Sequence, residues 1–137
     1  MNSLGIRCSN RYYSYAILTG TKSSPQLIEN QTIPFPNGFS RPQCLNWLLQ
    51  EINALIKKNK IERIVMKKFE GRTKGKSYEE RVEHEGVVYL SAFYCGIRPI
   101  FKKINRTIAK DLGLKGISRY LKTSLDTSKI AGYSDFP

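Results

Sequence analysis

The sequence predicts one α/β domain in which a three-stranded antiparallel meander is followed by alternating helices and strands. Three observations predict this class. Short runs rich in Tyr, Ile and Leu, separated by turn residues, occupy residues 4–35. A long stretch of helical periodicity follows, and shorter apolar runs then alternate with further helical stretches. The predicted order is β-β-β-α-β-α-β-α, and the length of 137 residues suits a single domain.

The three strands of the predicted meander cover Leu4–Cys8, Tyr12–Thr19 and Gln26–Phe35. Ser9, Asn10 and Arg11 form a short polar connection between the first two strands, typical of a tight hairpin. Because consecutive strands joined by short turns pair antiparallel, we expect the meander to form one half of a sheet.

The clearest helix covers Ser40–Asn59. Its apolar residues recur at intervals of three and four, which is the mark of one buried helix face; they are Leu45, Leu48, Leu49, Ile52, Leu55 and Ile56. Ser40 and Gln43 have the spacing of a capping box, and Pro42 suits the first turn.

The second half of the chain repeats this alternation. Ser77 and Glu80 predict a second capping box, which would open a helix from about Tyr78. Residues 124–137 show no periodicity and are predicted to be irregular. The other predicted elements are a strand at Ile61–Phe69, a basic loop at Glu70–Lys76, the helix Tyr78–Cys95, a strand at Ile97–Ile104 and a short helix at Arg106–Leu112.

Charge points to a polyanionic partner. Lys and Arg number 23 against 11 Asp and Glu, which gives a formal net charge of +12 and an isoelectric point near 9.8. Positive charges in such excess repel one another in a compact fold and attract nucleic acid. DNA or RNA is the first expectation, and an acidic membrane surface or an acidic protein comes next. The alternative is a solvated basic surface without a specific partner.

Several classes of site are disfavoured. Cys8, Cys44 and Cys95 are widely spaced and His84 is the only histidine, so no zinc-binding pattern is present. We expect reduced, buried thiols in a cytoplasmic protein and a helix-face role for His84. Neither a signal peptide nor a membrane-spanning run is predicted, and no cofactor is expected.

Five segments resemble the RuvC branch of the ribonuclease-H-like superfamily. They are Ser3–Arg7, Ile64–Phe69, Glu85–Ala92, Gly96–Phe101 and Ile108–Gly116, in the family's order. The resemblance implies a five-stranded mixed sheet, built from the antiparallel meander and two parallel strands and flanked by helices. It also implies contact with nucleic acid.

The chain departs from this family at the metal-binding acids. Arg7 stands where the family has its first-strand aspartate, and Met66, followed by Lys67, stands where it has the fourth-strand glutamate. Magnesium requires hard oxygen ligands, which arginine, methionine and lysine do not supply. The resemblance therefore implies a catalytically degenerate protein that binds without cutting.

Displaced carboxylates are the alternative. Glu70, Glu85 and Asp135 would have to converge to hold the two magnesium ions that a nuclease of this kind uses. Glu79 and Glu80 are better explained as favourable charges in the first turn of a helix.

Basic residues mark the predicted nucleic-acid contacts. One cluster is Lys67, Lys68, Arg72, Lys74 and Lys76, and a second is Lys102, Lys103 and Arg106. Such contacts bind phosphates without reading base sequence. Arg7 has two interpretations: it holds a phosphate, or it pairs with a carboxylate of the tail or a helix.

Three functions therefore remain open from sequence. The first is a degenerate RuvC-like protein that binds DNA or RNA, either as a homodimer or in a larger complex. The second is a magnesium-dependent nuclease with displaced carboxylates. The third is a structural subunit whose basic surface meets an acidic protein.

Overall fold

The computed structural model describes residues 1–21, 23–67, 75–98 and 100–103. Their element order confirms the predicted one as far as the fifth strand; the predicted helix at 106–112 and the irregular tail lie outside the described residues. The elements are β1 (Ser3–Cys8), β2 (Tyr12–Gly20), β3 (Pro25–Pro34), α1 (Arg41–Lys58), β4 (Arg63–Lys67), α2 (Lys76–Tyr94) and β5 (Ile100–Lys103).

The five strands form one mixed sheet in the order β3-β2-β1-β4-β5. β1 pairs antiparallel with β2, and β2 pairs antiparallel with β3, which is the predicted meander. β4 pairs parallel with both β1 and β5. The central position therefore belongs to β1.

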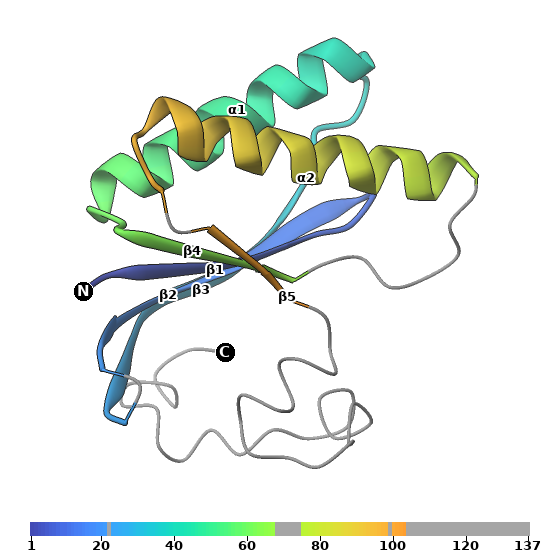
Figure 1. Ribbon diagram of the computed structural model, residues 1–137. Helices are drawn as coiled ribbons and strands as arrows, with labels where there is room; N and C mark the ends of the chain where they lie inside the picture. The colour runs from blue at the N-terminus through green and yellow to red at the C-terminus, as the bar shows by residue number, and fades with distance from the viewer. Residues whose placement is uncertain (22, 68–74, 99, 104–137) are drawn as a thin grey trace, which may run out of the picture.

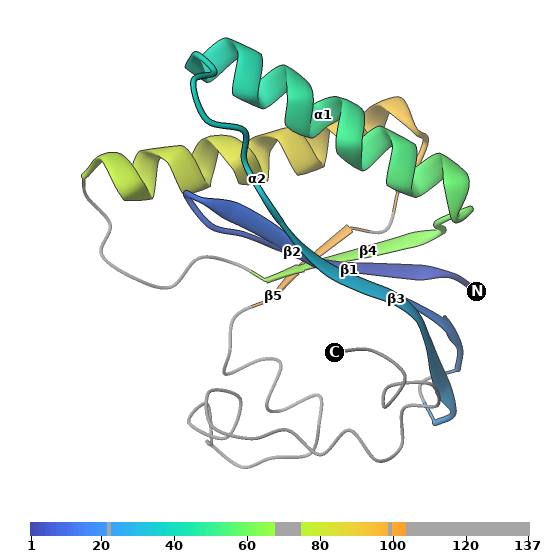
Figure 2. The same cartoon turned by 180° about the vertical axis from the view of Figure 1, so that it is seen from behind.

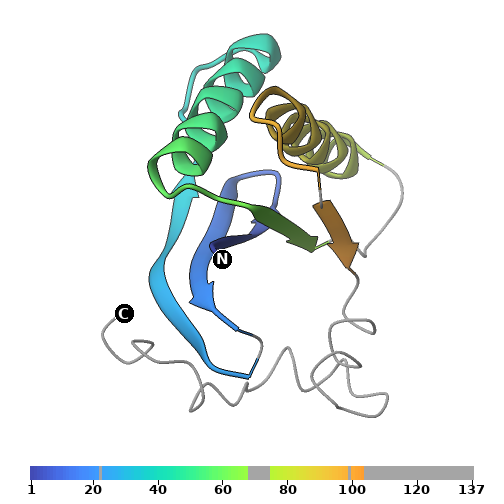
Figure 3. The same cartoon turned by 60° about the vertical axis from the view of Figure 1, so that its left-hand side comes forward.

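Both helices cover the same face of the sheet (Figure 1, Figure 3). Side chains alternate along β1, where Leu4 and Ile6 are buried while Arg7 is exposed. Successive strand residues point to opposite faces, so the buried set marks the face under the helices. Core residues from both layers meet there, including Ile17, Ile64 and Met66 of the sheet and Leu48, Ile52 and Val88 of the helices.

The start of α1 confirms the predicted capping box. The Gln43 backbone N–H donates to Ser40 Oγ at 3.3 Å, and the Ser40 N–H donates to Gln43 Oε1 at 2.8 Å. The predicted box at the start of α2 is wrong. Gly75 is the residue that precedes α2, with φ of 99°, and as a glycine it has no side chain to cap this end. Ser77 already lies inside the helix, two residues past the cap position at Gly75.

One edge of the sheet gathers several loops. β1, β3 and β4 all run in the same direction, so their carboxyl ends lie at this edge, and both helices begin there (Figure 1, right; Figure 2, left). We call it the carboxyl edge. In open α/β sheets ligands commonly bind outside the carboxyl ends of strands.

Two of the three cysteines are buried as expected, whereas Cys95 is partly exposed. Cys8, Cys44 and Cys95 are free thiols, of which the first two are buried. Burial, helped by the negative charge of Glu85, raises the pKa of Cys8 to about 12, so this thiol stays protonated. Among the described residues, no helix is both long enough and apolar enough to span a membrane.

Candidate nucleic-acid interface

Arg7 and Lys67 are neighbours on adjacent strands. Ile6 pairs with Met66 in the parallel ladder between β1 and β4, and each cation follows its partner by one residue. Because Ile6 and Met66 are buried under the helices, Arg7 and Lys67 point to the opposite face. Arg7 is exposed and forms no ion pair or side-chain hydrogen bond within the described part of the chain, whereas Lys67 is half-buried.

Lys67, rather than Met66, is the β4 residue that accompanies Arg7. The segment match placed Met66 at the position of the family's glutamate, but Met66 is fully buried in the core. The β4 residue that shares a face with Arg7 is Lys67. Two positively charged side chains, Arg7 and Lys67, therefore lie side by side on this face, and the thioether of Met66 does not reach it.

The two cations line a depression of about 420 Å³ on the face opposite the helices. Ser14 lies directly across from Arg7 in the ladder, and its hydroxyl shares a 2.9 Å hydrogen bond with Thr32 Oγ1. No carboxylate is among the described residues that line the depression. We call this surface the Arg7 face; it consists of Gly5, Arg7, Ser14, Ala16, Asn30, Thr32, Val65 and Lys67.

The Arg7 face is suited to an anion. A guanidinium and an ammonium supply positive charge, while hydroxyl and amide groups supply further donors. Gly5 and Ala16 are small, so they allow a ligand to approach the sheet closely. Planar recognition by arginine favours phosphate or carboxylate groups.

Glu85 does not join Arg7. It is 4 % exposed in α2, and its Oε1 accepts a 2.9 Å hydrogen bond from Lys102 Nζ of β5. Lys102 pairs with Met66 in the ladder, which places this ion pair on the helix side of the sheet. Burial alone would lower the pKa of Lys102, but the hydrogen bond and the negative charge of Glu85 raise it above its ordinary value.

The other predicted site residues divide into two groups. Lys76 is exposed and lies 3.9 Å from Glu80, while Lys103 lies in β5 opposite Lys67. Within residues 1–21, 23–67, 75–98 and 100–103, no three His, Cys, Asp or Glu side chains gather as a metal site. The remaining candidates lie outside the described residues: Lys68, Glu70, Arg72, Lys74, Arg106 and Asp135.

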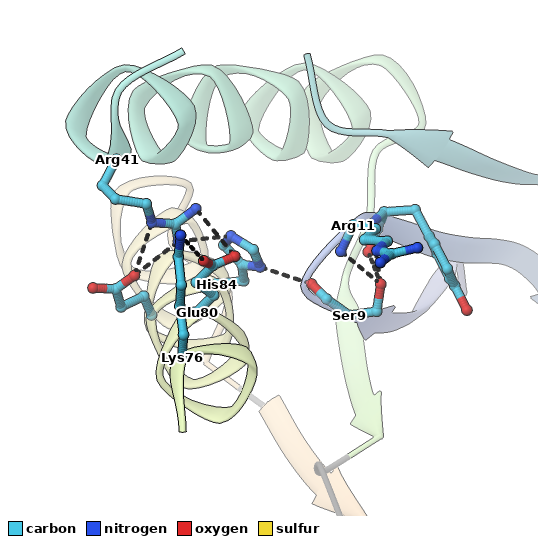
Figure 4. Close-up of polar contacts among 8 residues, drawn as sticks. Ser9, Arg11, Arg41, Lys76, Glu80 and His84 are labelled. Atoms are coloured by element: carbon cyan, nitrogen blue, oxygen red, sulfur yellow. Dashed lines mark hydrogen bonds and ion pairs between the residues drawn. The ribbon is translucent and has the colours of Figure 1, made fainter. Parts of the chain in front are cut away.

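His84 belongs to a polar cluster that sequence reasoning missed (Figure 4). Its ring is fully buried, with Nδ1 2.8 Å from the Ser9 carbonyl and Nε2 2.9 Å from Arg41 Nη2. Because arginine only donates, Nε2 must accept, so Nδ1 carries the proton and donates to Ser9. No local pattern predicts this cluster, since its members come from the β1–β2 turn, α1 and α2.

Burial is the main reason that His84 stays neutral. Burial lowers its pKa and the Arg41 charge lowers it further; the hydrogen bond to Ser9 and the charges of Glu80 and Glu83 act the other way, but the net change is downward. Arg41 is held in turn by Glu83 Oε1 at 2.7 Å. The cluster therefore fixes the β1–β2 turn to both helices, a structural role that agrees with the predicted helix-face residue.

The sheet order, with a central β1 between an antiparallel meander and two parallel strands, defines a ribonuclease-H-like α/β fold. Within that class the fold is RuvC-like. Thermus thermophilus RuvC superposes with a TM-score of 0.74 at 12% identity, over 85% of this chain and 72% of that one. The same protein in complex with a Holliday junction substrate gives 0.68 at 12% identity, over 84% and 80%.

A eukaryotic structure agrees. The yeast mitochondrial Holliday junction resolvase Ydc2 gives a TM-score of 0.65 at 17% identity, over 94% of this chain and 62% of that chain. At these identities the likeness establishes the fold alone. No family model matches the sequence. No curated protein matches it either.

Proposed function

We propose that this protein binds DNA or RNA through the Arg7 face without cutting it. The observation that carries the proposal is the pair Arg7 and Lys67, which lie side by side at the carboxyl ends of β1 and β4. Structures with the same fold include Holliday junction resolvases, one of them in complex with its junction. A formal net charge of +12 favours a polyanion.

Catalytic degeneracy rests on the same pair. Two neighbouring positive side chains repel divalent cations and can themselves neutralise a phosphate. We propose that they take over, in binding, the charge-compensating part that metal ions play in metal-dependent nucleases. The pairing of Glu85 with Lys102 removes one of the three carboxylates of the nuclease alternative from this face.

Binding is tested by fluorescence anisotropy with labelled single-stranded, duplex and four-way-junction oligonucleotides. We expect affinity to fall steeply between about 50 mM and 200 mM salt, since phosphate contacts release counterions. Arg7→Gln should lower affinity similarly for all nucleic-acid sequences. It should also reduce the slope of log affinity against log salt concentration by about one. Lys58→Gln is the matched control, because Lys58 is exposed at the far end of α1. Affinity independent of salt would refute the proposal.

Cleavage is tested separately with magnesium or manganese on the same oligonucleotides. We expect intact substrate and unchanged affinity when the metal is replaced by a chelator. Metal-dependent cleavage that is lost in Glu70→Ala would instead establish the displaced-carboxylate nuclease. A protein complex that survives nuclease treatment, together with no nucleic-acid binding, would favour the structural-subunit alternative.

We also propose assembly through α2, most simply as a homodimer. Val82, Leu90 and Phe93 are apolar and exposed on this helix, with Phe93 77 % exposed. Gly86 lies between them with nothing within 4 Å of the position of an added Cβ, so this side of α2 has room for a close partner. Light scattering on the wild type and on Phe93→Asp tests it: a dimer that Phe93→Asp converts to monomer is expected, and a monomeric wild type would refute it.

A further inference from the structure

A second concave feature lies at the carboxyl edge, beside the turn that follows β1. This cavity, of about 680 Å³, is bounded by the turn from Ser9 to Arg11, the loop after β3 and the first turn of α1. Its size falls within the ordinary range for small-molecule sites, about 300–1,000 Å³. The residues that give it chemical character are Asn10, Arg11, Phe35, Asn37, Phe39 and Arg41.

The two phenylalanines have different surroundings. Phe35 packs at 5.8 Å from the Trp47 ring and 4.3 Å from the His84 ring, so it forms a fixed wall. Phe39 takes part in no such packing among the described residues and is 45 % exposed. An accessible aromatic ring at the rim of a cavity offers a stacking surface for a planar ligand.

The two arginines also differ. Arg41 is committed to Glu83 Oε1 at 2.7 Å and to His84 Nε2 at 2.9 Å. The Arg11 side chain is exposed and forms no ion pair or hydrogen bond with the described residues. Arg11 is therefore the cation at this cavity that is available to an anion, and Asn10 and Asn37 add amide donors and acceptors.

The walls of the cavity are held in place before any ligand arrives. The Phe35 backbone N–H donates to the Arg11 carbonyl at 2.9 Å, which ties the loop after β3 to the turn. Ser9 Oγ accepts from the backbone N–H groups of Arg11 and Tyr12 at 3.1 and 3.0 Å (Figure 4). A preorganised site loses less conformational entropy on binding.

We propose that this cavity binds one unpaired nucleotide, with the base stacked on Phe39 and the phosphate paired with Arg11. The inference rests on the proposed nucleic-acid binding and deepens it by naming the substrate class. Arg7 precedes the turn by a single residue, Cys8, so the Arg7 face and the cavity both reach the carboxyl edge, the first from the open face of the sheet and the second from the side of α1. Unpaired bases can reach an aromatic ring, whereas bases stacked within a duplex cannot.

The test compares a single-stranded oligothymidine with a blunt duplex of the same length by anisotropy. Stacking on an aromatic side chain predicts that Phe39→Ala weakens single-strand affinity about tenfold and duplex affinity by less than about twofold. Phe39→Trp should retain single-strand affinity because it keeps an aromatic face. Arg11→Gln should weaken single-strand binding several-fold. Lys58→Gln is the matched control, because Lys58 is exposed at the far end of α1 and lies outside both concave features.

A covalent readout locates the base independently of affinity. An oligonucleotide that carries 5-iodouridine should, on irradiation, crosslink to the peptide that contains Phe39. Crosslinks only to other peptides would overturn the inference, as would a Phe39→Ala variant that binds both nucleic acids like the wild type or loses both equally. The proposed function survives these results if the wild type still binds in a salt-dependent way; absence of any binding refutes both.

Discussion

His84 couples the stability of the fold to pH at the level of one residue. The neutral ring accepts from Arg41 and donates to Ser9, and its pKa is lowered from the usual value. The unfolded chain therefore takes up a proton at a higher pH than the folded one. The contribution of His84 to folding stability is fully present above about pH 6.5 and declines as pH falls below it, because the unfolded chain binds a proton that burial, and then the charge of Arg41, keep off the folded ring.

The measurement is the free energy of unfolding in urea at several pH values from about 7.5 down to 5. The slope for one proton is at most about 1.4 kcal/mol per pH unit. His84→Gln should be less stable throughout but should lose this slope, since the chain has no other histidine. An unchanged slope in His84→Gln would assign the effect to another group.

Glu85 and Lys102 form the second residue-scale test. Removing one member of a largely buried ion pair leaves the other uncompensated, and Lys102 keeps a third of its side chain exposed. We therefore expect Glu85→Gln to lower the free energy of unfolding by about 1–3 kcal/mol. Lys102→Met is the partner variant, and the double variant should be less destabilised than the sum of the two.

The same experiment separates a structural role for Glu85 from a catalytic one. If the role of Glu85 is structural, Glu85→Gln lowers the free energy of unfolding and leaves nucleic-acid binding and cleavage unchanged. If Glu85→Gln instead unfolds like the wild type and abolishes a metal-dependent cleavage, Glu85 is a member of a displaced active site.

At the scale of elements, the two helix starts make opposite predictions for two serines. Ser40 caps α1 by a reciprocal hydrogen-bonded box, whereas Ser77 lies inside α2 and the cap position of that helix is Gly75. Ser40→Ala should lower the free energy of unfolding by about 1 kcal/mol, and Ser77→Ala should change it by less than about 0.5 kcal/mol. Urea denaturation of the two variants measures the difference; equal losses would contradict the assigned caps.

These serines also show what the sequence could and could not predict. The strand and helix order followed from apolar periodicity, which is a local property, and the box at Ser40 followed from local spacing. The same spacing at Ser77 was misleading because Gly75, with its positive φ, starts α2 earlier. The spacing of two residues indicates which capping hydrogen bonds are possible, but the backbone conformation at the helix start determines which of them form.

The candidate site divides in the same way. Arg7 could be singled out from sequence because it stands where the RuvC branch, which the sequence resembles, has its first-strand aspartate. That Arg7 lies beside Lys67 depends on the register between β1 and β4. That Glu85 meets Lys102 depends on the register between β4 and β5. The cluster of Ser9, Arg41 and His84 joins three elements. Contacts between distant segments arise only once the sheet and helices have packed, so local patterns do not contain them.

At the scale of the whole molecule, the net charge of +12 acts on folding and on binding in opposite directions. Like charges brought together by folding repel one another, and added salt screens this repulsion. Salt also weakens attraction to a polyanion, because the counterions released on binding gain less entropy when the solution already contains more salt. Stability of the free protein should therefore rise with salt while nucleic-acid affinity falls.

Thermal unfolding with and without an oligonucleotide at increasing salt measures both effects together. The Tm of the free protein should rise between about 50 mM and 500 mM NaCl, since the Debye length falls over this range. The added Tm increment from the oligonucleotide, present at low salt because the ligand binds the folded state, should shrink toward zero. A free-protein Tm that falls with salt would mean that loss of binding reflects unfolding rather than screening. A constant increment would mean that contacts other than phosphate pairing with Arg7, Lys67 and their neighbours hold the nucleic acid.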